Sequence, residues 1–245
     1  MIDKTINYFL HSGHAGDIIY SLPTITTFSG KSILILKRKR RSNDYYDVLY
    51  RLLKLQPCLH DVRRLADWTE QDTPWLSFNH YKRLSRGDLS KHLVACHLEI
   101  FNKTYDLSKP WLENIKSQYI ADIIITRTTR FHDKEEVDWT LLKPFVDKCK
   151  FVGHHYEHQE FIKLYNCDIE YYPTKDALDV AQVIKGSKLF IGNNSMNLAI
   201  AEGLRHPRCV ELYRYHPCAG NCDPNNNDGY WTYLTEELIY KHILK

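Results

Sequence analysis

The sequence predicts an α/β protein made of two Rossmann-like domains that face each other across a cleft. Apolar runs of strand length alternate with amphipathic helical periods, most regularly beyond residue 121, and this alternation is typical of a parallel, doubly wound sheet. Each half also contains an apolar strand that leads through a small polar turn into a helix. Lys109-Pro110-Trp111 interrupts the pattern, so we place the domains at residues 1–110 and 111–245.

The N-terminal half starts with clear elements and then loses its pattern. We expect strands at 6–10 and 32–36 and helices at 43–55 and 89–101. Residues 58–87 follow neither period, and residues 67–74 are typical of a loop over the cleft. The second strand runs into five cations, Lys37 to Arg41, which suit either a solvated loop or contacts to phosphates of an acceptor.

The C-terminal half alternates more clearly. Its expected strands are 122–126, 150–153, 168–171, 188–191 and 208–212, and its expected helices are 139–149, 158–165, 176–185, 195–204 and a last one from Thr235. In the third of these helices, Ala177, Val180, Ala181 and Ile184 fall on one apolar face. Open parallel sheets of this kind bind ligands in the crevice at the carboxyl ends of their strands.

Residues 188–204 are the stretch that most strongly suggests a binding site. We expect Gly192 to end a strand before Asn193, Asn194 and Ser195, whose short side chains can accept a hydrogen bond from a first-turn amide. The same turn presents free amides and the positive end of the helix dipole, which suit a diphosphate. The alternative is an ordinary helix cap that binds nothing.

Residues 11–17 form a similar turn after the first strand. Gly13 and Gly16 let the backbone turn tightly and approach a ligand. Asp17 stands where a helix begins, so its carboxylate either caps that helix or points into the cleft, where it can act as a general base.

Composition and charge exclude few classes of protein function. A formal net charge of +3 is too small to require a polyanionic partner. No apolar run approaches the ~20 residues of a membrane span, so we expect no transmembrane segment and a cytoplasmic protein. The seven cysteines are scattered, which argues against disulfides. Cys218 and Cys222, beside His216 and Asp223, give only a weak zinc signal, and we assign no metal.

Two motifs together resemble a known family. Residues 11–23, His-Ser-Gly-His-Ala-Gly-Asp-Ile-Ile-Tyr-Ser-Leu-Pro, resemble the N-terminal signature of glycosyltransferase family 9, the ADP-heptose:lipopolysaccharide heptosyltransferases. The stretch from Asp179 through Gly192 to Pro207 is similar to that family's second signature, without a gap. The motifs agree in order, spacing and structural context, whereas residues 59–110 carry no part of the resemblance.

The resemblance implies a GT-B architecture. The N-terminal domain would hold the acceptor and the C-terminal domain the nucleoside-diphosphate sugar, in an inverting, metal-independent transfer that needs no cofactor. Asp17 would take the proton from the acceptor hydroxyl. The donor and its phosphates would be bound by Gly16, Arg130, Lys134, Asn193, Asn194, Ser195 and Met196, the nucleoside by Glu157, and the acceptor by His14, Lys37, Arg38, His80 and Arg83.

Several of these residues also have a simpler interpretation. Arg130 and Lys134 could equally be ordinary loop cations. We expect His154, His155 and His158, which surround Glu157, to be exposed polar residues.

Two positions depart from the family pattern and keep alternatives open. The family usually has Asp at the position of Asn194 and Gly at that of Met196, so this chain loses both repulsion toward a diphosphate and a contact to the sugar. One alternative is the same chemistry on a hydroxylated nucleic-acid base, suggested by the basic run from Lys37 to Arg41 and by Arg83 and Arg86. The other is a nucleotide-sugar-binding or scaffold protein without catalysis.

Overall fold

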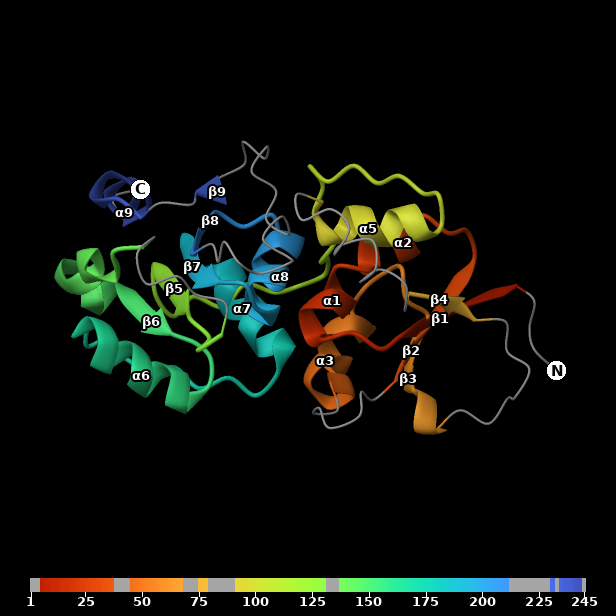
Figure 1. Ribbon diagram of the computed structural model, residues 1–245, viewed down its shortest axis with the longest axis horizontal. Coiled ribbons are helices and arrows are strands. Elements are labelled where there is room, and N and C mark those ends of the chain that lie inside the picture. The colour runs from red at the N-terminus through yellow and green to blue at the C-terminus, as the bar shows by residue number, and fades with distance from the viewer. Residues whose placement is uncertain are drawn as a thin grey trace.

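The computed structural model describes residues 5–37, 45–67, 75–78, 91–130, 137–211, 230–231 and 234–243. Two separate parallel sheets lie side by side, each with its own helices, and helices from both halves fill the space between them (Figure 1). This confirms the predicted pair of Rossmann-like domains.

The described part of the N-terminal half contains four strands: β1 (Ile6–His11), β2 (Lys31–Leu36), β3 (Asp61–Arg64) and β4 (Leu76–Ser77). Its helices are α1 (Ala15–Ile19), α2 (Leu22–Thr26), α3 (Tyr45–Lys54), α5 (Leu93–Ile100) and a 3₁₀ turn, η1 (Leu65–Asp67). The sequence did not predict β3 and β4. Three of the four residues of β3 are charged and only Val62 is buried, so its apolar signal is too weak to recognise.

Five strands lie in the residues that the structure describes of the C-terminal half: β5 (Ile123–Thr126), β6 (Cys149–Phe151), β7 (Leu189–Asn193), β8 (Arg208–Glu211) and β9 (Tyr230–Trp231). Its helices are η2 (Trp139–Lys148), α6 (His155–Tyr165), α7 (Ala177–Gly186), α8 (Met196–Gly203) and α9 (Glu236–Ile243). In α7 the predicted apolar face is buried, and Asp176 caps the helix by accepting hydrogen bonds from the amides of Leu178 and Asp179.

Strand order locates the crevice of each sheet. The first sheet has the order β3-β2-β1-β4 and the second β6-β5-β7-β8-β9, and every strand pair is parallel. In the first sheet the chain adds β2 and β3 on one side of β1 and then places β4 on the other side. In the second sheet it adds β6 on one side of β5 and then β7 on the other side. The order therefore reverses between β1 and β4 and between β5 and β7, which is where such sheets bind ligands.

Three predicted elements of the C-terminal half were wrong in detail. Gly192 does not end a strand but continues β7, where a Cβ would lie 2.7 Å from the carbonyl oxygen of Thr126, so the close strand contact demands glycine. Residues 168–171 form no strand, only a single bridge from Tyr171 to Phe151. Residues 139–148 form two 3₁₀ pieces separated by a kink at Phe145, directly after Pro144, which lacks an amide donor for helical bonding.

The two halves share a hydrophobic core. One buried cluster joins Phe9 and Leu52 of the N-terminal half to Val180, Leu198 and other apolar residues of α7 and α8. A second cluster lies within the C-terminal half, on the other face of its sheet. Helices α1 and α3 therefore pack directly against α8 and α7, as Figure 1 shows between the sheets.

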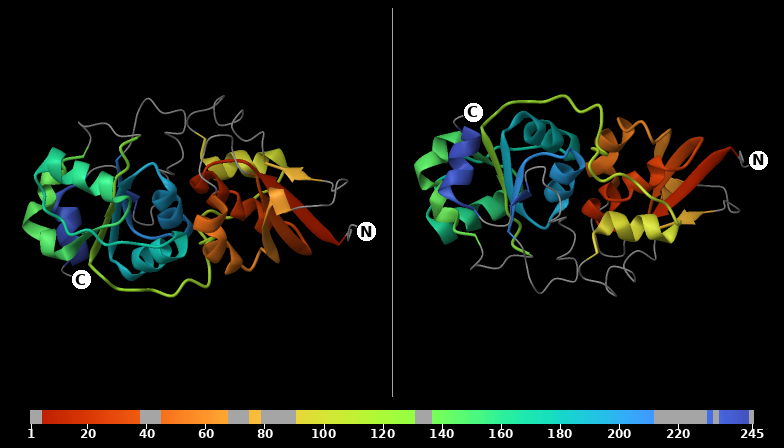
Figure 2. Two further views of the ribbon diagram at one scale, coloured as in Figure 1. Left: turned by 90° about the horizontal axis from the view of Figure 1, so that it is seen from below. Right: turned by 90° about the horizontal axis from the view of Figure 1, so that it is seen from above.

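The connection between the halves runs along one side of both (Figure 2). It comprises the irregular residues 101–122 between α5 and β5, so the predicted boundary at 110/111 falls inside it. The amides of Trp111 and Leu112 both donate to the carbonyl of Gly203 over 2.9 Å. A Cβ on Gly203 would lie 2.7 Å from the side chain of Leu112, so the connection packs closely on the end of α8.

Among the described residues, no helix combines the length and the apolar character that crossing a membrane requires.

Candidate functional site

The two sequence motifs meet in space. Gly16, in the first turn of α1, lies against the start of α8: a Cβ at this position would be 3.5 Å from the carbonyl oxygen of Ser195 and 3.6 Å from the Cα of Met196. Two segments nearly 180 residues apart thus form one junction between the halves. A Cβ at Gly16 would make only ordinary van der Waals contacts, so the two helix starts touch without requiring glycine at this position.

Asp17 is the third residue of α1, and His14 is the N-cap. The Asp17 Oδ2 atom accepts a hydrogen bond of 2.9 Å from the backbone amide of His14. The carboxylate is only partly buried. Its position is therefore fixed by the backbone beside it, while its role as a base stays a prediction.

Tyr45, which the sequence did not single out, connects the groups around Asp17. It is the first residue of α3, and its hydroxyl lies 2.9 Å from Nδ1 of His14. Burial raises the pKa of Tyr45; the positive charge of Arg130 opposes this rise and the negative charge of Asp17 adds to it. Tyr45 is thus within electrostatic reach of the predicted base in one half and the predicted phosphate ligand in the other.

Asn193 organises the loop that carries Arg130. Its fully buried side chain accepts a hydrogen bond from the amide of Thr128 (2.9 Å) and donates to the carbonyls of Thr128 (3.0 Å) and Arg130 (2.9 Å). This places the loop after β5 beside the end of β7, at the point where strand order reverses. Asn193 therefore contributes through this loop, and Arg130 itself is exposed.

The turn after β7 is the start of a helix, as expected. Ser195 is the N-cap of α8, and its Oγ accepts a hydrogen bond from the amide of Leu198 over 3.3 Å. Asn194 and Met196 flank it and are partly exposed. The first turn of α8 thus presents amides and the positive dipole end next to α1.

Glu157 is a buried carboxylate in the first turn of α6. Its Oε2 accepts a hydrogen bond of 3.1 Å from the amide of His154. Burial raises its pKa, while the hydrogen bond from His154 and the charge of Arg130 oppose that rise. The expectation of exposed histidines holds for His154 and His155 but is wrong for His158, which is buried with Nε2 2.6 Å from the carbonyl oxygen of Ile169.

A buried ion pair lies at the carboxyl ends of the strands in the C-terminal sheet. The sequence did not predict this pair. Arg127 Nε lies 2.9 Å from Glu211 Oε2, and both side chains are almost inaccessible. The pair joins the ends of β5 and β8 on either side of β7. The partners are 84 residues apart, so no local pattern could reveal them.

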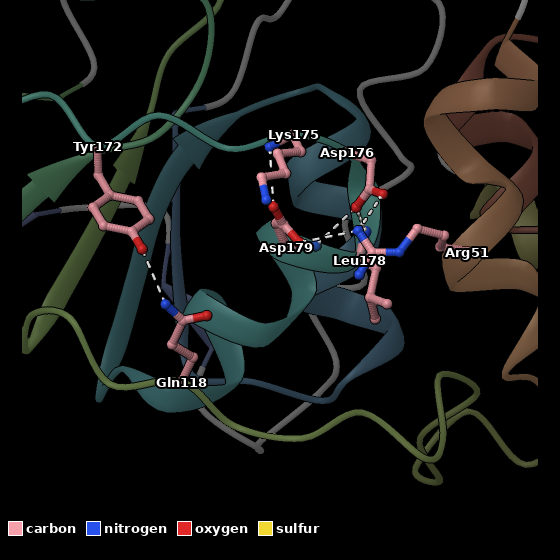
Figure 3. A network of polar contacts seen from close by, with 7 residues as sticks. All are labelled: Arg51, Gln118, Tyr172, Lys175, Asp176, Leu178 and Asp179. Atoms are coloured by element: carbon pink, nitrogen blue, oxygen red, sulfur yellow. Dashed lines mark hydrogen bonds and ion pairs between the residues drawn. The ribbon is translucent and has the colours of Figure 1, made fainter.

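Polar contacts also join the two halves. Arg51 of α3 reaches α7, with Nη1 2.8 Å from Asp176 Oδ2 and 3.4 Å from Asp179 Oδ1 (Figure 3). Deeper in the interface, the Tyr20 hydroxyl donates to Oε2 of the buried Glu202 over 2.6 Å.

The acceptor side is less complete. Lys37 is exposed directly after β2, and its amide donates to the carbonyl of His11. The other basic candidates and the cysteine pair considered for zinc lie outside the described residues: Arg38, His80, Arg83, Lys134, Cys218 and Cys222. Within the described residues, no group of three or more His, Cys, Asp or Glu side chains is placed to hold a metal.

Several solved structures are similar to this chain in overall fold. E. coli heptosyltransferase WaaC with ADP is similar over 94% of both chains, with a TM-score of 0.62 and 12% identity. This chain has the fold of glycosyltransferase family 9. WaaC with ADP-2-deoxy-2-fluoro heptose aligns over 84% of this chain and 88% of its own, with a TM-score of 0.56 and 12% identity. The family 9 glycosyl transferase from Veillonella parvula DSM 2008 aligns over 99% and 90%, with a TM-score of 0.58 and 10% identity.

The likeness to family 9 lies in the fold. No protein-family model and no curated protein matches the sequence. At 10–12% identity, the structural match confirms the predicted GT-B architecture and leaves the roles of individual residues as predictions. In this fold, Asp17, Asn193 and Glu157 follow or end β1, β7 and β6, so all three lie at carboxyl ends of parallel strands.

Proposed function

We propose that this protein transfers a sugar from a nucleoside-diphosphate sugar to an acceptor hydroxyl. The observation that carries the proposal is the junction of Gly16 with Ser195 and Met196, which puts a carboxylate motif beside a helix start suited to phosphate. The similar WaaC structures with ADP and an ADP-sugar analogue support an ADP-sugar as the donor.

Asp17 serves as the general base in this proposal. It takes the proton of the acceptor hydroxyl while that oxygen forms a bond to the anomeric carbon of the sugar. The bond between the anomeric carbon and the diphosphate oxygen breaks at the same time, and the diphosphate leaves with the electron pair. One displacement from the opposite face inverts the configuration at the anomeric carbon.

The C-terminal half stabilises the departing diphosphate. The first turn of α8 offers amide donors, and Arg130, on the loop held by Asn193, offers a cation. Neither group requires a metal. Glu157, when ionised, accepts hydrogen bonds from the two vicinal hydroxyls of the ribose.

A panel of nucleotide-sugars tests this function. Each donor is incubated with the protein, with and without candidate acceptors that include glycans and hydroxymethylated DNA, and released nucleoside diphosphate is measured. We expect release to depend on an ADP-sugar and an acceptor. Donor binding without release under all conditions would instead identify a nucleotide-sugar-binding protein without catalysis.

A further inference from the structure

An exposed aromatic pair stands beside the site. Tyr156, in the first turn of α6, is 57% exposed, and its ring lies parallel to that of His154, with an interplanar angle of 13° and centroids 5.4 Å apart. Tyrosine is enriched at binding interfaces, because its ring offers apolar contact area and its hydroxyl offers a polar group. Of the described large apolar side chains that are exposed, Tyr156 alone adjoins the groups discussed above; the others are Leu55, Tyr119, Leu164 and Tyr240.

Contacts with Tyr171 hold the segment that carries this pair in place. The ring of Tyr171 contacts those of His155 and His158, with centroids 5.2 and 5.3 Å apart. The Tyr171 hydroxyl donates to the carbonyl of Gly153 over 3.0 Å, just before the helix. The exposed pair is therefore presented on a preformed surface, which lowers the entropic cost of binding.

Three kinds of group occur together here. The Tyr156 hydroxyl lies 3.5 Å from Oε1 of the buried Glu157, so the aromatic ring and the carboxylate are neighbours. The charge of Arg130 acts on both Tyr156 and Glu157, which places the cation within electrostatic reach of each. An aromatic face, a carboxylate and a cation match the base, the ribose and the phosphates of a nucleotide.

We propose that Tyr156, backed by His154, is the stacking platform for the base of the donor nucleotide. This inference rests on the proposed function and adds the base-binding surface to it. Stacking uses the π-face that every base has, and it gains with the stacked area. The platform therefore favours the two-ring base of a purine nucleoside diphosphate over a pyrimidine.

Binding of ADP and of ribose 5-diphosphate, which lacks the base, separates stacking from the other contacts. By calorimetry, Tyr156→Ala should weaken ADP binding about 5- to 100-fold and leave ribose 5-diphosphate binding unchanged. Tyr156→Phe, which keeps the ring, should bind ADP within about twofold of the unchanged protein. Tyr119→Ala is the matched control, because it removes another exposed tyrosine (66% exposed) from the connection between the halves.

A fluorescent variant gives a direct signature. In Tyr156→Trp, ADP should quench the indole emission and ribose 5-diphosphate should not, because only the base stacks on the ring. Equal ADP affinity of Tyr156→Ala and the unchanged protein would overturn the platform and leave the proposed function standing. If the unchanged protein binds no nucleoside diphosphate, both proposals fail.

Discussion

At the scale of single residues, the site depends on side chains that have two tasks. The Asp17 carboxylate holds the amide of His14 and is also the proposed base. The Asn193 side chain makes three hydrogen bonds to the backbone of Thr128 and Arg130 and so helps to place Arg130. Substitutions at such residues change stability and activity together unless the structural bond is preserved, which guides the choice of variants.

Asp17→Asn separates the two tasks of this side chain. The amide oxygen can still accept the hydrogen bond from His14, so the melting temperature should stay within a few degrees of the parent. Because an amide cannot take up the proton, kcat should fall about 100- to 10,000-fold with donor affinity unchanged. Turnover equal to that of the parent would remove Asp17 from the mechanism.

Asn193→Asp tests the loop support. The new oxygen replaces an amide nitrogen that donates to two carbonyls in a buried place, so the free energy of unfolding should fall by about 2–4 kcal/mol. ADP affinity should fall too, because Arg130 loses its fixed position. Asn194→Asp is the control: the same chemical change at the next, partly exposed residue should alter stability by less than about 0.5 kcal/mol. Urea unfolding and calorimetry measure both effects.

At the scale of elements, two glycines of the site differ in how closely their surroundings pack. Between β5 and β7 there is no room for a side chain at Gly192, whereas a Cβ at Gly16, between α1 and α8, would make ordinary contacts. Packing therefore requires glycine at position 192 but not at position 16, although both positions belong to the motifs that resemble family 9.

Alanine substitution distinguishes the two glycines. Gly192→Ala forces a methyl group to within 2.7 Å of Thr126 and should destabilise the protein by about 1–3 kcal/mol or more. Gly16→Ala should leave the free energy of unfolding unchanged to within about 0.5 kcal/mol, because its neighbours lie at 3.5 Å and beyond. Urea unfolding of both variants checks this order, and a larger loss at Gly16 would contradict the packing described.

At the scale of the whole molecule, buried polar groups join the halves. Burial tends to raise the pKa of Glu202. The pKa is nevertheless lowered, because the carboxylate is hydrogen-bonded to His92 and Tyr20 and lies near the charges of His92 and Arg208. The interface thus contains a buried ionised group shared by α1, α8 and the start of α5. Separating the two halves would take the Glu202 carboxylate away from Tyr20 and His92 and leave its charge without these partners. We therefore expect the two halves to unfold together.

Buried histidines give the molecule a pH-dependent stability. Burial lowers the pKa of His97 to about 4, against the nearby charge of Asp17, and the pKa of His206 to about 4, aided by Arg208. The unfolded chain, with histidine pKa values near about 6.5, binds more protons between pH 4 and 6.5. The free energy of unfolding should therefore fall by about 2 kcal/mol per histidine from pH 7 to pH 5.

Substitution tests whether His97 causes the fall in unfolding free energy between pH 7 and pH 5. In His97→Leu, the difference in unfolding free energy between pH 7 and pH 5 should shrink by about 2 kcal/mol, because the unfolded state loses the group that takes up the proton. Urea titrations of parent and variant at both pH values measure it. His60→Leu, at an exposed position, is the control and should keep the parent slope. An unchanged slope in His97→Leu would show that His97 is not the titrating group.

By itself, the sequence determined the fold class and the two helix starts. The alternation of buried strands and amphipathic helices depends on local periodicity, and so does the cap at Ser195, because each is decided by residues close together in the chain. The same dependence explains the errors: β3 is short and charged, and Gly192 resembles a strand end until its neighbour Thr126 is placed beside it.

Only the tertiary structure decided which side chains meet. The pairing of Arg127 with Glu211, the contact of Tyr45 with His14 and the bonds of Asn193 to the 128–130 loop all join segments distant in the chain. Their geometry follows from strand order and helix packing, which bring together residues that share no local pattern. Motif chemistry can therefore name a carboxylate and a helix start, but long-range packing determines what surrounds them.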